Sequence, residues 1–235
     1  MQLDGNRLRW MANNDFSLFS LLSSLFSLLF SLFSFLSSLS LLTVPYFLFN
    51  LRAVNVKLLV RIAFGALFAA LIAAGTFIAI PIGPVPIVLQ NLFALLAGLV
   101  LGPLWGAAAV GLYLLAGILN VPVFAGGSGG IARFAGPTGG YLPGYLLAAI
   151  TAGLIAGSPA LNSRIPLPRL IAAVAAGLLV VYIPGVAWLK ISRGLGWARA
   201  IMAGFLPFII GDILKGIVAV LIAPRLRRTA ADFLV

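Results

Sequence analysis

The feature that most constrains this chain is a succession of long apolar segments separated by short stretches rich in Gly, Pro or basic residues. Six such segments follow Leu51, at about 59–80, 86–102, 104–120, 141–158, 168–188 and 200–222. Each is long enough to cross the ~30 Å hydrocarbon core of a bilayer as a helix, in which the backbone satisfies its own hydrogen bonds. The pattern therefore predicts an all-α polytopic membrane protein with six transmembrane helices.

The residue inventory excludes most catalytic chemistry. The 235 residues are 63% hydrophobic and 8% charged, and they include no Cys and no His. Thiolate or imidazole metal sites, disulfides and Cys or His catalysis are thereby ruled out. Three of the four acidic residues, Asp4, Asp15 and Asp232, lie in terminal segments, so a carboxylate pair inside the membrane cannot form. We expect no metal, no cofactor and no enzymatic activity.

The net charge of +11 is distributed as in a membrane protein rather than a nucleic-acid-binding one. Basic residues flank the apolar segments instead of gathering with aromatic residues on a soluble face. One side would carry Arg52, Lys57, Arg61, Arg164, Arg169, Arg225, Arg227 and Arg228, and the other Arg133, Lys190, Arg193 and Arg199. Because Lys and Arg favour the cytoplasmic side, both termini of the six-helix core should be cytoplasmic, in a multi-pass protein of the cell membrane.

The chain divides by composition into three parts. Residues 1–50 form an extension with a Phe/Ser/Leu low-complexity tract at 16–42, which is either an extra span, a targeting segment or non-native sequence upstream of the true start. Residues 51–228 form the six-helix membrane domain that would bind a substrate. Residues 229–235 are expected to be a C-terminal tail.

Two ionisable residues interrupt the last apolar segment. Asp212 and Lys215 are three positions apart, so they share one helix face and can form an ion pair that lines a pocket. Charged groups at membrane depth cost several kcal/mol unless they face a partner or a cavity. The pair is thus either a ligand site, which we favour, or a structural contact between helices.

Further polar residues occur near the predicted outer face. Gln90 and Asn91 follow a proline-rich stretch and either pair with a neighbouring helix or contact a ligand. The glycine-rich connection 121–140 contains Arg133 and is either a flexible tether or, as Arg133 favours, a lid over a ligand. Together the candidates predict a site for a small anion with a second polar end: Arg133, Asp212, Lys215, Gln90, Asn91, Thr138, Tyr141 and Tyr145.

The first apolar segment carries small residues at a four-residue spacing. Ala66, Ala70 and Ala74 form one stripe, and Gly65, Ala69 and Ala73 form an adjacent one. Such stripes allow another helix to approach closely. The partner helix belongs either to this chain or to a separate membrane protein.

Four motifs give the chain a specific resemblance over about residues 55–225. They are GPTGGYLPGY at 136–145, VPIVLQNLFALLAGLVLGP at 85–103, LNVPVFAGGSGGI at 119–131 and GDILKG at 211–216. In their order and spacing they resemble the BioY family, the biotin-specific substrate-capture (S) components of energy-coupling factor (ECF) transporters. Tyr145 departs from this family, in which Phe is usual at that position.

The resemblance implies a fold and a function. The expected fold has six membrane helices that hold biotin near the outer face, under the loop that precedes the fourth helix. The expected partners are a transmembrane coupling protein, contacted through the Ala66, Ala70 and Ala74 face, and two cytoplasmic ATPases. The alternative is a self-sufficient secondary carrier or facilitator for biotin or another small vitamin-like anion, in which Asp212 relays ions.

Overall fold

The computed structural model describes residues 56–80, 85, 87–160 and 165–234. The predicted N-terminal extension at 1–50 lies outside these residues. The elements, in chain order, are α2 (Val56–Gly75), β1 (Ala79–Ile80), β2 (Ile87–Val88), α3 (Gln90–Ile118), α4 (Ala132–Ala135), α5 (Tyr141–Ala156), α6 (Leu167–Val180), α7 (Tyr182–Arg193), α8 (Trp197–Gly204), the 3₁₀ helix η2 (Leu206–Phe208) and α9 (Ile209–Leu234). The two short strands pair antiparallel, with Ala79 opposite Val88. The helical prediction is therefore confirmed, with this hairpin as a small addition.

Helix α3 contains the second and third predicted spans, which meet at a sharp break. Gly102 has φ 82° and ψ 179°, a conformation open to glycine, and Pro103 follows it. The break folds α3 back on itself, because a Cβ on Gly106 would lie 2.6 Å from the Cα of Gly98. On another side, a Cβ on Gly98 would overlap the carbonyl oxygen of Ala149 in α5, so glycine is required for this close packing.

The fifth and sixth predicted spans are interrupted, which the sequence analysis did not anticipate. The fifth divides at Val181 into α6 and α7, and Pro184 falls in the first turn of α7, where a missing N–H costs little. The sixth divides at Phe205 and η2, where Pro207 interrupts the helix. As a result Asp212 lies in the first turn of α9 and not in the middle of a continuous helix.

Helix α9 also extends further than predicted. It continues to Leu234, and Ala230 and Leu234 are buried in the core together with Leu99 and Leu170. The structure thus differs from the predicted tail at 229–235, because Ala230, Ala231 and Leu234 are buried in the bundle.

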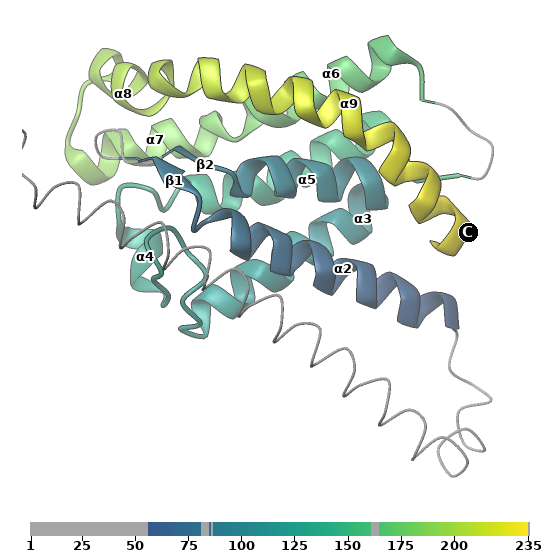
Figure 1. Cartoon of the computed structure of the whole chain (residues 1–235). Helices are drawn as coiled ribbons and strands as arrows, with labels where there is room; N and C mark the ends of the chain where they lie inside the picture. Colours follow the sequence, from purple (N-terminus) through teal and green to yellow (C-terminus); the bar gives the residue numbers. More distant parts are fainter. Residues whose placement is uncertain (1–55, 81–84, 86, 161–164, 235) are drawn as a thin grey trace, which may run out of the picture. The chain divides into compact units, whose positions relative to one another are not determined.

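The N-terminus of α2 and the C-terminus of α9 lie at the same end of the bundle (Figure 1). Arg61 donates a hydrogen bond to the carbonyl oxygen of Leu234 at 2.9 Å. We call this end, which also contains Gly102, the inner end, since the distribution of basic residues predicts that it faces the cytoplasm. The outer end contains the β1–β2 hairpin, the connection 119–140 and the first turn of α9.

The helices have the length and surface of membrane spans. Within the residues that the structure describes, four helical stretches are long and apolar enough to cross a bilayer: Val56–Gly75, Gln90–Ile118, Leu167–Arg193 and Trp197–Leu234. Helix α5 is shorter and largely buried between α3, α6 and α7. Large apolar side chains such as Leu104, Ile210 and Leu221 are exposed, as expected of surfaces that contact lipid.

Candidate ligand-binding site

Asp212 is the centre of a buried polar cluster at the outer end. Its Oδ1 accepts hydrogen bonds from Asn91 Nδ2 at 3.0 Å and from Lys215 Nζ at 2.9 Å, the latter an ion pair. Its Oδ2 accepts a hydrogen bond from the hydroxyl of Tyr182. Asp212, Lys215 and Asn91 are 7%, 6% and 9% exposed, so this charge pair is held away from water and lipid by polar partners.

The break before α9 explains why a carboxylate is tolerated there. In the first turn of a helix the backbone N–H groups lack intrahelical acceptors, and the helix dipole favours negative charge. Lys215 follows one turn later on the same face. Asn91 comes from the start of α3 and Tyr182 from the start of α7, so the cluster ties the first turns of α3, α7 and α9 together.

Two small cavities adjoin this cluster. Cavity A has a volume of about 30 Å³ and is lined by Val85, Val88, Gln90, Phe124, Ala125, Arg133, Thr138, Tyr141, Leu142 and Tyr145. Cavity B, also about 30 Å³, is lined by Val85, Val88, Asn91, Tyr141, Tyr145, Val181, Tyr182, Phe208, Asp212 and Lys215. They share four lining residues, Val85, Val88, Tyr141 and Tyr145. The structure therefore brings all eight predicted site residues to two adjoining cavities.

The polar groups differ between the two cavities. Cavity A has the guanidinium of Arg133 at its exposed side, where it donates to the carbonyl oxygen of Ala125 at 3.3 Å. It also has Gln90, which is 2% exposed and whose Oε1 has no hydrogen-bond partner within the described residues. Cavity B contains the Asp212–Lys215 pair. A ligand across both cavities would meet at one end a cation that has no ion-pair partner among the described residues, and at the other end a pair of opposite charges.

The glycine-rich connection 119–140 is a folded cover rather than a loose tether. Phe124 is 2% exposed, and its ring packs edge-on against Tyr113 at 5.6 Å and Phe134 at 6.0 Å. Phe124 and Ser128 form a β-bridge, and Gly130 N donates to the carbonyl oxygen of Gly117 at 2.7 Å. These contacts place Phe124 and Arg133 over cavity A.

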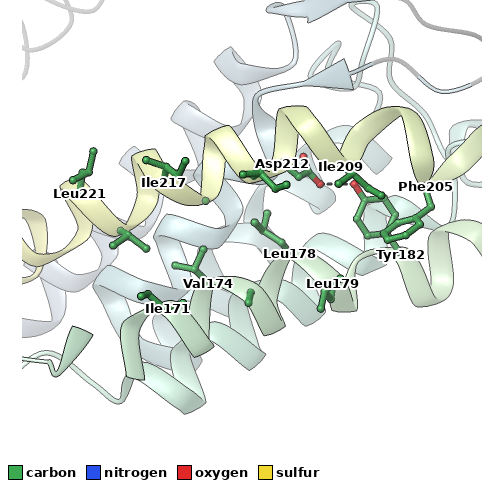
Figure 2. Close-up of a pocket in the computed structure, with 14 residues that line it drawn as sticks. Ile171, Val174, Leu178, Leu179, Tyr182, Phe205, Ile209, Asp212, Ile217 and Leu221 are labelled. Atoms are coloured by element: carbon green, nitrogen blue, oxygen red, sulfur yellow. Dashed lines mark hydrogen bonds between the residues drawn. The ribbon is translucent and has the colours of Figure 1, made fainter. Parts of the chain in front are cut away.

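A much larger apolar groove lies on the other side of Asp212, between α6 and α9 (Figure 2). Its volume is about 550 Å³, and it is lined by Ile171, Val174, Ala175, Leu178, Leu179, Tyr182, Phe205, Ile209, Asp212, Ile213, Gly216, Ile217, Val220 and Leu221. Only Asp212 and the Tyr182 hydroxyl contribute polar side-chain groups. Despite its size, the groove lacks the convergent polar groups that orient a polar ligand.

The alanine stripe of α2 faces away from the bundle. Ala66, Ala70 and Ala74 are exposed, whereas Gly65 and Ala69 are buried against neighbouring helices. The outward stripe is thus available to another helix.

Sequence analysis missed Tyr182 as a site residue. Its side chain completes the coordination of Asp212, although it is distant in sequence and lies at an unpredicted helix break. The adjacent Pro184 is a signal of that break.

Comparisons with known proteins agree with this architecture. The model of the BioY family matches residues 50–232. The chain is 44% identical over 162 residues to a probable biotin transporter BioY of Pyrococcus horikoshii, covering 69% of this chain and 93% of that one. It is 41% identical over 166 residues to the biotin transporter BioY of Thermotoga maritima, covering 71% of this chain and 95% of that one.

A solved structure is also similar. It is the crystal structure of the S-component for biotin from an ECF-type ABC transporter, with a TM-score of 0.66 and 33% sequence identity. The match covers 74% of this chain and 94% of that chain. The helical bundle described above is thus the S-component fold.

Proposed function

Because the chain belongs to the BioY family, we propose that it takes up biotin across the cell membrane as the substrate-binding subunit of an ECF transporter. The observation that carries this proposal is the convergence of eight polar residues from four separate segments on two adjoining cavities at the outer end. The spanning helices, together with membership of this transporter family, make it a multi-pass protein of the plasma membrane.

The chemistry of biotin matches the two cavities. Its carboxylate is suited to Arg133, since a guanidinium can bind a carboxylate through two parallel hydrogen bonds. Its ureido ring has two N–H donors and a carbonyl acceptor, which suit Asp212 and Lys215 respectively. Gln90, Asn91, Thr138, Tyr141 and Tyr145 supply neutral donors and acceptors and aromatic walls between these ends. Leaving any of these polar groups unpaired would penalise an analogue.

Ligand binding requires the outer end to open. Each cavity has a volume of about 30 Å³, far below the roughly 300–1,000 Å³ of ordinary small-molecule pockets. The shared walls Tyr141 and Tyr145 belong to the largely buried helix α5, whereas Phe124 and Arg133 lie on the glycine-rich cover. We therefore assign the role of a lid to the cover at 119–140.

Transport requires partners, and no covalent step is part of the proposal. The exposed stripe of Ala66, Ala70 and Ala74 is suited to contact a transmembrane coupling protein, which two cytoplasmic ATPases would drive. The domain that does this work is the six-helix bundle, in which every binding residue of the proposal lies.

The direct test is the binding of labelled biotin, and of other small vitamins as competitors, to the purified chain in detergent. We expect saturable binding of biotin that the other vitamins do not displace. Absence of saturable biotin binding by a folded, monodisperse protein would refute the proposal. Uptake that is abolished by a protonophore in vesicles that contain this chain alone would instead identify a secondary carrier.

A further inference from the structure

Tyr182 lies at a boundary between two very different spaces. It is the first residue of α7, and its ring packs edge-on against Phe205 at 4.7 Å and Tyr141 at 6.4 Å. Its hydroxyl donates to Oδ2 of Asp212, as the dashed line in Figure 2 indicates. Tyr182 and Asp212 are the residues common to the linings of cavity B and the α6/α9 groove.

The groove is a poor environment for a carboxylate. Its other lining residues have aliphatic or aromatic side chains or, at Gly216, no side chain. It lies between membrane-spanning helices, so an unpaired carboxylate oxygen at this wall would adjoin hydrocarbon. The Tyr182 hydroxyl is the neutral donor that prevents this.

The two carboxylate oxygens of Asp212 have different partners. Oδ1 accepts from Asn91 and Lys215, and Oδ2 accepts from Tyr182 within the described residues. Three donors on two oxygens fix the plane of the carboxylate. Without the hydroxyl, Oδ2 would lose a charge-assisted hydrogen bond and the carboxylate would be free to rotate.

We propose that Tyr182 is a positioning residue of the ligand site. Its hydroxyl orients the Asp212 carboxylate toward the ligand, and its ring, braced by Phe205, separates the ligand cavity from the lipid-facing groove. This inference rests on the proposed biotin-binding function, because it assigns to Tyr182 an effect on ligand affinity that acts through Asp212.

The test uses Tyr182→Phe, which keeps the ring contacts and removes the hydroxyl. We expect this variant to fold but to melt below the wild-type temperature, because Oδ2 of Asp212 loses its donor, and to bind biotin about ten- to hundredfold more weakly, as expected for loss of one charge-assisted hydrogen bond. The binding of biotin methyl ester should weaken by the same factor, since this ligand keeps the ureido ring. The matched control is Ile213→Ala, which alters the groove wall at an exposed apolar residue and should change affinity by about twofold at most.

A double-mutant cycle separates positioning from mere packing. In an Asp212→Asn background, Tyr182→Phe should cause little further loss of biotin binding, because the residue through which it acts is already altered. Additive losses would overturn the inference, as would unchanged or tighter biotin binding by Tyr182→Phe. If the wild-type chain binds biotin and Tyr182→Phe matches it, only this inference fails. If the wild-type chain binds no biotin, the proposed function fails as well.

Discussion

Helix α9 carries buried charged side chains toward each end, and the two sets are stabilised by different kinds of hydrogen-bond partner. At the outer end, Asp212 and Lys215 pair with each other and with side chains next to two cavities. At the inner end, Arg227 is 8% exposed, and its acceptors among the described residues are all backbone carbonyl oxygens, those of Leu99, Ala156, Gly157 and Ser158.

The backbone explains the position of Arg227. Pro103 has no N–H, so the carbonyl oxygen of Leu99, four residues earlier, lacks its helical donor, and Arg227 supplies one. The other three carbonyls are at the C-terminal end of α5, where helical acceptors are free and the dipole favours a cation. Asp212 and Lys215 have side-chain partners and lie beside cavities, which indicates a binding site. Arg227 has carbonyl partners at helix ends, which indicates a structural clamp.

The largest expected effect on stability is at the inner clamp. Arg227→Ala leaves several buried carbonyls without donors and should lower the free energy of unfolding by about 2–5 kcal/mol. Arg227→Lys should lower the free energy of unfolding by an intermediate amount, because an ammonium group cannot reach the same set of acceptors. The matched control is Arg228→Ala, at an exposed neighbouring position, which should hardly change the free energy of unfolding. Thermal unfolding in detergent measures all three, and equal melting of Arg227→Ala and Arg228→Ala would contradict the clamp.

The next effect is on affinity at the outer end. Arg133 is exposed and bonds only to a backbone carbonyl within the described chain, so Arg133→Ala should leave stability unchanged. The substitution should weaken the binding of biotin by about ten- to hundredfold and the binding of biotin methyl ester far less, because only the acid carries the charge. If equilibrium binding weakens equally for both ligands, Arg133 does not contact the carboxylate.

A third variant concerns the lateral face rather than either end. Ala70→Trp places a large ring in the exposed alanine stripe and should keep a coupling protein at a distance. Biotin binding should stay within about twofold of wild type, whereas uptake that depends on the coupling protein should fall strongly. Parallel loss of binding and uptake would mean that the stripe packs within this chain.

The smallest effect is expected for the N-terminal extension. Every proposed ligand residue lies between Gln90 and Lys215, so a chain that lacks residues 1–50 should bind biotin with wild-type affinity. A truncated protein that inserts and melts normally yet fails to bind would contradict the assignment of binding to the six-helix domain.

The sequence predicted the outer site better than the inner clamp, for physical reasons. Asp212 and Lys215 are conspicuous because they are charged residues inside an apolar run, and their spacing alone predicts the ion pair that the structure contains. Arg227 instead occurs among other basic residues at a span end, where the pattern predicts an exposed flank. Its role depends on Leu99 and Ser158, which only tertiary structure brings near.

The helix breaks show a similar contrast. Gly102 and Pro103 fall at the boundary between two predicted spans, 86–102 and 104–120, so the break in α3 was predicted. The breaks at Val181 and Phe205 fall inside continuous apolar runs, where Pro184 and Pro207 were the available signals. Because hydropathy does not register these breaks, the sequence predicted neither Tyr182 as a partner of Asp212 nor the position of Asp212 in a first helical turn.

The central claim is that the Asp212–Lys215 pair binds ligand and does not merely hold helices together. Biotin binding and melting temperature should therefore be measured for Asp212→Asn, Lys215→Ala and the double variant Asp212→Leu/Lys215→Leu. Replacement of both charges by apolar residues removes the ion pair without leaving an uncompensated charge, so the double variant can remain stable. The account predicts a stable double variant that has lost biotin binding, together with single variants that bind weakly. A stable double variant that still binds biotin tightly would contradict it.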